Sequence, residues 1–251
     1  MGIVNVTPDS FSGDGVTDPA RAVEQGLAMA AAGADVVDVG GESTRPGHTP
    51  VPVAEEIARV VPVVAGLAKA GVSVSVDTSK LEVAAAAAEA GAGMVNDVWG
   101  LQRSPGIARL AATRGLGLVL MHNQDGHEYE ADLMQTVKAV LARSVRAALE
   151  AGVPAERVIV DPGIGFGKTA GQNLVVLRRL EELRELGQPV LVGASRKSFL
   201  GRLFGQEMET RVWGTAAVVA AAVLRGAAWV RVHDVPEMRA VARVAEGLRS
   251  A

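Results

Sequence analysis

Short apolar runs alternate along the chain with longer segments in which apolar residues recur every three or four positions. The runs are rich in valine and isoleucine, which favours strands, and the period of the longer segments favours amphipathic helices. Expected strands cover residues 2–6, 35–39, 72–76, 93–95, 116–121, 158–160, 189–192 and 229–232. Expected helices cover about 18–32, 53–70, 79–88, 107–113, 131–151, 173–186, 210–225 and 236–248.

This alternation of strand and helix persists over all 251 residues and predicts the fold class. Strands that look apolar on both faces are expected to be parallel and covered on both sides. Eight such units predict an α/β fold, a (β/α)₈ TIM barrel that forms a single domain over residues 1–251. A doubly wound open sheet is the alternative, but no glycine-rich dinucleotide motif follows the first strand.

Composition narrows the possible classes of function. The absence of cysteine excludes disulfides, thiolate nucleophiles and cysteine–metal sites. A net charge of −3 and 3% aromatic residues argue against a nucleic-acid surface or a base-stacking platform. No apolar run reaches the ~18 residues that a membrane span needs, and Met1 directly precedes a strand pattern, so we expect no signal peptide. A cytoplasmic protein without nucleic-acid or membrane partners is therefore expected.

The glycine-rich segment 161–168, DPGIGFGK, follows the apolar run 158–160 directly. Asp161 stands at the exit of that predicted strand, and three glycines follow at alternate positions with Phe166 between them. Glycine permits positive φ and a close approach of a ligand to the backbone. The segment is equally consistent with a site for a flat heterocycle that has N–H donors and with a tight loop that carries a capping aspartate.

Polar residues gather where the predicted strands end, which is where a barrel of this kind has its site. They are Asn5, Glu42, Thr44, Arg45, Asp77, Asn96, Asp97, His122, Asp161, Ser195, Arg196, Lys197, Ser198, Arg231, His233 and Asp234. For Thr78, Ser79 and Asp234 a turn or helix-capping role explains the residue type. Burying unpaired carboxylates costs several kcal/mol each, so an inward-facing set implies a ligand or cations that pair with it.

The set divides into two chemical halves. Asp77, Asn96, Asp161 and Lys197 offer acceptors, an amide and one cation, which suits the edge of a pyrimidine-like ring. The other half, made of Arg45, Arg231, His233 and the Asn5–Thr7 turn, suits phosphate oxygens. Ligands with a polar heterocycle and a phosphate-containing tail fit both halves, and salt bridges at the rim are the alternative for the arginines.

Eight motifs in a fixed order carry a family resemblance. They are NVTPDSF at 5–11, GGESTRPG at 40–47, VDTSK at 76–80, ND at 96–97, MH at 121–122, DPGIGFGK at 161–168, GASRKSFLG at 193–201 and RVHDV at 231–235. With them the chain resembles the dihydropteroate synthases from end to end. The resemblance implies a transferase of folate biosynthesis that joins 6-hydroxymethyl-7,8-dihydropterin diphosphate to 4-aminobenzoate, giving 7,8-dihydropteroate and pyrophosphate, with Mg²⁺ as cofactor.

The resemblance also implies a role for individual residues. The implied pterin pocket consists of Asp77, Asn96, Met121, Asp161, Lys197 and Arg231. The implied diphosphate site consists of Asn5, which also meets Mg²⁺, Thr44, Arg45, Arg231 and His233. The implied 4-aminobenzoate site consists of Phe11, Pro46, Phe166, Lys197 and Ser198. The implied catalytic set is Asp77, Asp161, Lys197, Arg231 and His233.

The mechanism that the resemblance implies is early departure of pyrophosphate, which leaves a pterin-methyl cation for the arylamine to attack. A homodimer is implied as well, with the alanine-rich helix near residues 216–222 as a flat packing surface, and sulfonamides are the implied inhibitors. Two alternatives are a folate-dependent methyltransferase domain and a catalytically inactive pterin-binding paralogue. A methyltransferase domain has little use for a diphosphate site, and the inactive paralogue would bind the pterin diphosphate without releasing pyrophosphate.

Overall fold

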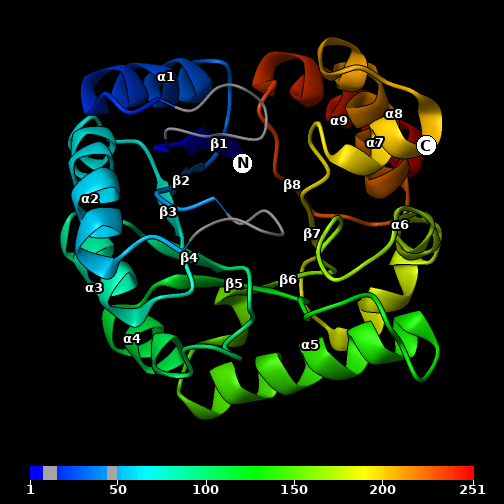
Figure 1. The fold of residues 1–251 in the computed structure, drawn as a ribbon, viewed down its shortest axis with the longest axis horizontal. Coiled ribbons are helices and arrows are strands. Elements are labelled where there is room, and N and C mark those ends of the chain that lie inside the picture. The colour runs from blue at the N-terminus through cyan, green and yellow to red at the C-terminus, as the bar shows by residue number, and fades with distance from the viewer. Residues whose placement is uncertain (8–15, 44–49) are drawn as a thin grey trace.

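The computed structural model describes residues 1–7, 16–43 and 50–251, and its strands close into a parallel barrel (Figure 1). The strands are β1 (Gly2–Asn5), β2 (Val37–Gly40), β3 (Val74–Asp77), β4 (Met94–Asp97), β5 (Gly117–Met121), β6 (Val158–Asp161), β7 (Leu191–Val192) and β8 (Trp229–Val230). β1 to β6 form one sheet in sequence order, and β7 pairs with β8. The backbone N–H of Val160 donates to the carbonyl of Pro189 at 2.9 Å, and that of Ile3 donates to the carbonyl of Val232 at 3.1 Å. These bonds join the two sheets on both sides, so the expected (β/α)₈ barrel is confirmed.

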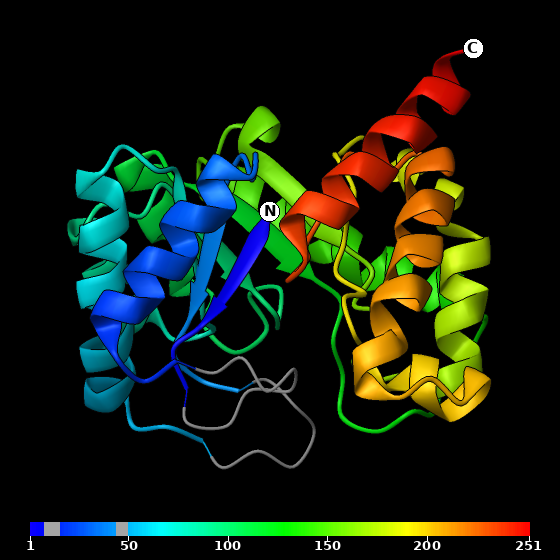
Figure 2. The same ribbon diagram turned by 90° about the horizontal axis from the view of Figure 1, so that it is seen from above.

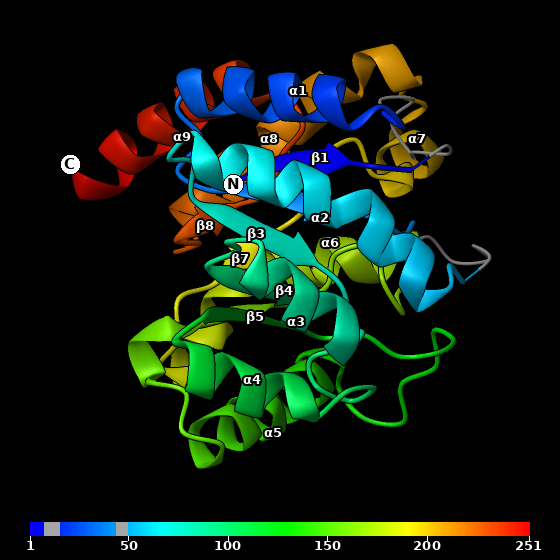
Figure 3. The same cartoon turned by 90° about the vertical axis from the view of Figure 1, so that its left-hand side faces the viewer.

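Helices surround the barrel, and the three views show them outside the strands all the way round (Figures 1, 2 and 3). They are α1 (Pro19–Ala31), α2 (Val53–Lys69), α3 (Leu81–Glu89), α4 (Gly106–Arg114), α5 (Leu133–Glu150), α6 (Ala170–Arg178), α7 (Ser198–Phe204), α8 (Arg211–Leu224) and α9 (Val235–Ser250). Short 3₁₀ helices lie at Ala155–Arg157, Leu180–Leu186 and Met208–Thr210. The eight expected pairs of strand and helix are therefore observed, together with α7, a short helix that the sequence analysis did not predict.

One expected helix, over residues 173–186, is split into α6 and the 3₁₀ segment Leu180–Leu186. Leu180 and Leu183 are both fully buried and lie three residues apart. In a 3₁₀ helix residues i and i+3 are eclipsed, so this geometry places both leucines against the core. A pattern with apolar residues three apart does not distinguish this segment from an α-helix.

The expected helix caps have mixed outcomes. The Asp18 side chain accepts from the backbone N–H of Ala20 at 2.9 Å and caps α1, as its position before a proline predicts. The capping role expected for Ser79 is wrong, because α3 begins after Lys80 and has no side-chain cap. Asp234 precedes α9 but makes no capping bond either. Its carboxylate instead pairs with Arg196, which donates from Nε at 3.0 Å and from Nη2.

The barrel interior is layered. The layer toward the amino-terminal ends of the strands is apolar and consists of Met1, Val36, Val119, Ile159 and Leu191, with Met94 and Trp229 packed against it. Side chains alternate between the two faces of a strand, so the residues two positions further along point inward as well. Those residues include the polar side chains of Asp38, Asn96, Asp161 and Arg231. The expectation of strands that are apolar on both faces is therefore wrong for this second layer, which is polar.

A buried ionic cluster fixes α2 against the end of β3. The Lys80 ammonium donates to Glu42, to Glu56 and to the backbone carbonyl of Val51, each at 2.6 Å. Glu56 is 1% exposed and also accepts from the Thr78 hydroxyl at 2.7 Å. The Thr78 hydroxyl accepts in turn from the backbone N–H of Lys80 at 3.2 Å, so the expected turn role of Thr78 is confirmed. The chain just beyond Asp77 is thereby tied to the start of α2.

We expect Glu56→Ala to lower the free energy of unfolding by about 2–4 kcal/mol, because Lys80 and the Thr78 hydroxyl both lose a buried partner. Glu55→Ala is the matched control. Glu55 lies in the same first turn of α2 and so has the same helix-dipole term, but its side chain is 51% exposed in its pair with Arg59. The control should change stability by no more than about 0.5 kcal/mol. Equal losses for the two variants in urea unfolding would contradict the anchoring role of the cluster.

Candidate active site

The polar layer is organised around Arg231, which follows β8. The Arg231 guanidinium donates from Nε to Asp38 at 2.6 Å and from Nη2 to Asp77 at 2.7 Å. Asn96, at the end of β4, donates from Nδ2 to the same Asp38 oxygen at 2.9 Å. One arginine therefore joins the interior of β2, the end of β3 and the segment after β8, and the shared Asp38 carboxylate adds β4. Three residues predicted for the pterin pocket, Asp77, Asn96 and Arg231, lie together here.

Asp38 is a residue of this site that the sequence reasoning missed. It is fully buried within β2 and occupies the centre of the hydrogen-bond network. The signal in the sequence is a single carboxylate between two valines in an otherwise apolar run, Val37-Asp38-Val39. A charged residue inside a predicted buried strand needs a partner, and that requirement identifies it as a candidate site residue.

Burial dominates the electrostatics of this layer. It raises the pKa of Asp77 to about 7, and the neighbouring Arg231 acts in the opposite direction. Burial also raises the pKa of Asp161, against the effect of Lys197. One oxygen of Asp77 and one of Asp38 are buried without a hydrogen-bond partner among the residues that the structure describes. The layer therefore holds unsatisfied acceptors, which N–H donors of a ligand could meet.

The glycine-rich segment adopts a tight loop with Asp161 at its base. The Asp161 carboxylate accepts from the backbone N–H of Gly163 at 2.7 Å. Gly163, Gly165 and Gly167 all have positive φ, at 71°, 85° and 55°. A Cβ atom on Gly163 would lie 2.0 Å from the carbonyl oxygen of His122, so no other residue fits there. The geometry is that of a tight loop, but Thr169 and not Asp161 caps the helix that follows. The site for a flat heterocycle stays a prediction.

Lys168 supports this loop from behind, a role that the sequence did not indicate. It is 5% exposed, and its ammonium donates to the carbonyls of Gly163 and Phe166 at 3.0 Å each and lies 2.9 Å from Nδ1 of His122. Burial lowers the pKa of Lys168 to about 7. Burial and then Lys168 lower the pKa of His122 to about 3, so its ring is neutral and Nδ1 accepts. Phe166 is thereby held by its backbone.

Lys197 and Phe166 lie together on the other side of the loop. The Lys197 ammonium donates to the backbone carbonyl of Ile164 and lies 4.2 Å from the centre of the Phe166 ring. Burial lowers the pKa of Lys197 to about 8, against the effect of Asp161. Lys197 is the residue just before α7, and Ser198 begins that helix. An aromatic face, an ammonium and a helix start therefore adjoin the acceptors of the polar layer.

The remaining predicted residues lie on β1, β5 and the segment after β8. Asn5 ends β1, in register with Gly40 and, through it, with Asp77. Met121 ends β5 and is 3% exposed. His233 donates from its backbone N–H to the Ser195 hydroxyl at 3.1 Å, and its Nδ1 lies 2.9 Å from the same oxygen. Phe11, Thr44, Arg45 and Pro46 lie outside the described residues.

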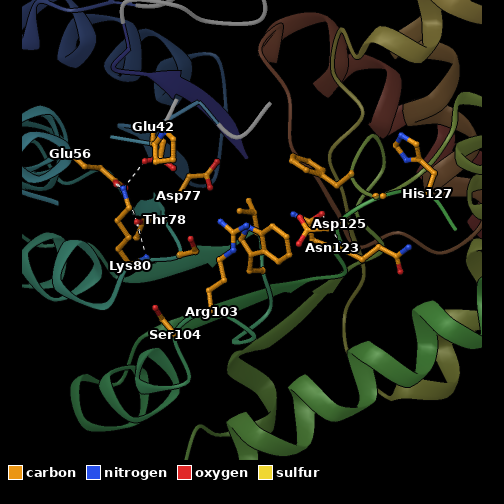
Figure 4. Close-up of a pocket in the computed structure, with 18 residues that line it drawn as sticks. Glu42, Glu56, Asp77, Thr78, Lys80, Arg103, Ser104, Asn123, Asp125 and His127 are labelled. Atoms are coloured by element: carbon orange, nitrogen blue, oxygen red, sulfur yellow. Dashed lines mark hydrogen bonds and ion pairs between the residues drawn. The ribbon is translucent and has the colours of Figure 1, made fainter. Parts of the chain in front are cut away.

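A cavity of about 650 Å³ opens beside this layer at the carboxyl ends of β3 to β6. Asp77, Thr78 and Phe166 line it together with Trp99, and the Arg103 guanidinium stacks 3.6 Å from the Trp99 ring centre. Figure 4 shows Glu42, Glu56 and Lys80 on one wall and Asn123, Asp125 and His127 across from them. Within the described part of the chain, no three histidine or acidic residues converge on a metal site, and no helix is long and apolar enough to cross a bilayer.

The fold and the site define a (β/α)₈ barrel with a buried, acceptor-rich polar layer at the carboxyl ends of its strands. Residues 1–233 match the family model described as pterin binding enzyme. The chain is 44% identical to the dihydropteroate synthase of Clostridium beijerinckii, over 98% of this chain and 92% of that protein.

Solved structures give the same result. The dihydropteroate synthase of Clostridium difficile, determined in the presence of pteroic acid, has a TM-score of 0.94 and 43% identity over 99% of this chain and 95% of the other. The Yersinia pestis enzyme in complex with a sulfonamide drug has a TM-score of 0.94 and 42% identity over 100% and 94%. The chain therefore belongs to the pterin-binding enzyme family, and within that family to the dihydropteroate synthases, which are transferases.

The raised pKa of Asp77 has a consequence for stability. Because the folded value of about 7 exceeds the ordinary value of 3.8, the native state binds the extra proton and is stabilised below pH 4, and this contribution is lost as pH rises through 7. When the pH is raised from 5 to 7.5, the unfolding free energy of the wild-type protein should fall by about 2–3 kcal/mol more than that of Asp77→Asn. The variant has no titrating group at position 77. Urea unfolding at both pH values measures this. A pH-independent difference between the two proteins would show that Asp77 is ionised throughout.

Proposed function

We propose that the chain condenses 6-hydroxymethyl-7,8-dihydropterin diphosphate with 4-aminobenzoate, releasing pyrophosphate and 7,8-dihydropteroate, with the polar layer as the pterin pocket. The observation that carries this assignment is the set of buried acceptors around Arg231. Asp77 and Asp38 each have one buried oxygen with no hydrogen-bond partner in the described ranges, and Asp161 lies at the base of the neighbouring loop. Buried acceptors can pair with the N–H donors of a ring, whereas a ring with carbonyl groups at those positions would leave the acceptors unpaired.

The pterin is proposed to contact Asp77, Asn96, Met121, Asp161, Lys197 and Arg231. In this arrangement Met121 contributes an apolar contact at the end of β5. The Arg231 guanidinium, which is held flat by two carboxylates, offers a face for stacking on the ring. Lys197 places a cation beside Asp161, which favours the charged form of that carboxylate.

The diphosphate is proposed to lie toward Asn5, Arg231 and His233, where Thr44 and Arg45 are also expected. Gly40 lies between Asn5 and Asp77, and a Cβ atom there would be 3.9 Å from the Asn5 oxygen and 3.6 Å from the Asp77 Cβ atom. The missing side chain therefore leaves room beside an amide oxygen, which fits Mg²⁺ held by one protein ligand together with phosphate oxygens and water. Asn5 would hold that ion, whose charge would stabilise the leaving pyrophosphate.

The residues present suit a dissociative reaction. The bond between the pterin methylene carbon and the diphosphate oxygen breaks, and its electron pair leaves with pyrophosphate. Asp77 and Asp161 place negative charge beside the methylene cation that results. The nitrogen lone pair of 4-aminobenzoate then forms the new C–N bond, and that nitrogen loses a proton. This route needs no enzyme nucleophile, and the chain has no cysteine that could act as one.

The 4-aminobenzoate is proposed to bind over Phe166, Lys197 and Ser198, with Phe11 and Pro46 completing the pocket. The Lys197 ammonium above the Phe166 ring supplies a cation next to an aromatic surface, which suits an aromatic carboxylate. Sulfonamides resemble this arylamine and are proposed to compete for the same place. Among the alternative functions, a methyltransferase domain draws no support from the named relatives, and the assay below tests for an inactive paralogue.

The assay couples pyrophosphate release to a colour change, with and without 4-aminobenzoate. We expect release by the wild-type protein that depends on the arylamine. Asp161→Asn should weaken binding of the pterin substrate by ~2–4 kcal/mol, because a charged acceptor is lost from paired N–H donors. Asp125→Asn is the matched control: Asp125 is an exposed carboxylate that lines the neighbouring cavity, and this variant should bind the pterin normally. If calorimetry shows that Asp161→Asn binds the pterin as tightly as the wild-type protein does, Asp161 is not part of the pocket. If the wild-type protein binds the pterin diphosphate but releases no pyrophosphate, the chain is an inactive paralogue.

A homodimer is proposed from an apolar surface on α8 and α9, which lie side by side in Figure 1. Trp213 and Leu224 on α8 are 73% and 43% exposed, and Val244 and Leu248 on α9 are 65% and 67% exposed. Exposed apolar residues grouped in this way are typical of a protein interface. Trp213 and Leu224 flank the alanine-rich stretch of α8 in which the sequence placed the packing surface. A cytoplasmic location stays a prediction.

We expect Trp213→Glu to convert the dimer to a monomer, because a carboxylate would be buried in an apolar interface without a partner. Sedimentation velocity at micromolar concentration measures the change. Leu149→Glu on α5 is the matched control, since Leu149 is 41% exposed outside the proposed surface. A dimer that survives Trp213→Glu, or a monomeric wild-type protein, would contradict the assignment of this interface.

A further inference from the structure

Asp38 differs from the other carboxylates of the site because it lies beneath the pocket mouth, with no exposed surface. Its Oδ2 atom accepts two hydrogen bonds, from Arg231 Nε at 2.6 Å and from Asn96 Nδ2 at 2.9 Å. A carboxylate that is removed from water in this way is costly unless its partners are charged or donate hydrogen bonds. Asp38 therefore constrains both of its neighbours.

The first constraint concerns the amide of Asn96. An amide can present either its oxygen or its NH₂ group to a ligand. Asp38 is an acceptor only, so it draws the NH₂ group of Asn96 toward the barrel interior. The amide oxygen of Asn96 is then left for a ligand, and the orientation of this side chain becomes a consequence of Asp38.

The second constraint concerns the guanidinium of Arg231. Nε and Nη2 share one edge of the guanidinium plane, and two carboxylates from different strands occupy that edge. Two directed bonds fix both the position and the tilt of a planar group. If Asp38 were absent, the bond to Asp77 alone would leave the plane free to turn about it.

We propose that Asp38 is a positioning residue that sets the hydrogen-bond polarity of the pterin pocket. By orienting Asn96 and Arg231 it makes the pocket present acceptors to the ring edge, so that an amino-substituted ring is selected over its oxo analogue. This inference rests on the proposed pterin site. A carboxylate with only a structural role would stabilise the barrel without changing the choice between two rings.

The test compares two ligands in calorimetry, 6-hydroxymethylpterin and the analogue in which an oxo group replaces the 2-amino group. Asp38→Leu removes the acceptor oxygens while keeping the branched shape of the side chain. Asp38→Ala is used if the larger leucine prevents folding. We expect either variant to bind the pterin about tenfold to a hundredfold more weakly than the wild-type protein. The ratio of pterin to oxo-analogue affinity should fall by about tenfold or more, because Asn96 can then turn its NH₂ group to the ligand.

Two further variants separate orientation from charge. Asp38→Asn keeps an acceptor oxygen but loses the charge, so it should bind more weakly yet retain most of the selectivity. Asp35→Asn removes an exposed carboxylate just before β2 and should leave both affinities unchanged. Wild-type protein that binds no pterin would refute the proposed site itself. Wild-type protein that binds, with both ligands weakened by the same factor in Asp38→Leu or Asp38→Ala, would overturn the positioning role.

Discussion

The structure depends most on one arginine shared between two buried carboxylates. Arg231 comes from the last strand of the barrel, whereas Asp38 and Asp77 come from the second and third. Burial of these charged groups in the barrel is tolerated only because the guanidinium and the carboxylates pair with one another. The same arrangement leaves a surplus of acceptors, since two carboxylates meet one guanidinium, and this surplus defines what kind of ligand the pocket can take.

Two supports outside the polar layer hold the remaining parts of the site. On one side Lys80 ties the end of β3 to the start of α2 through Glu42 and Glu56. On the other side Lys168 fills the space behind the glycine-rich loop with three hydrogen bonds and so fixes Phe166. Lys168 is buried behind its loop, whereas Lys80 is partly exposed on the cavity wall, and the hydrogen bonds described for both lysines go to protein groups. Rigid supports of this kind hold catalytic groups in place before the substrate binds, so that little conformational entropy is lost on binding.

The order of strands and helices could be predicted from periodicity, because eight short apolar runs separated by helical patterns leave few other folds. The polar residues at strand ends could be predicted as well, since a barrel brings those ends to one rim. Asp38 was missed because strand ends were searched and strand interiors were taken as apolar. The capping roles predicted for Ser79 and Asp234 are wrong. Their residue types favour capping, and the local sequence does not indicate a long-range partner such as Arg196, which pairs with Asp234. The same limit applies to the contact between Lys168 and His122, which lie 46 residues apart in the sequence.

The central claim is that the layer around Arg231 forms the floor of the pterin pocket. A crystal structure with 6-hydroxymethylpterin bound tests it most directly. The account predicts that the ring lies on this layer, with its N–H groups bonded to Asp161 and to the amide oxygen of Asn96, and that Arg231 keeps its bonds to Asp38 and Asp77. A ring bound elsewhere at the barrel mouth, or a bound ring with the Arg231 pairs broken, would contradict it.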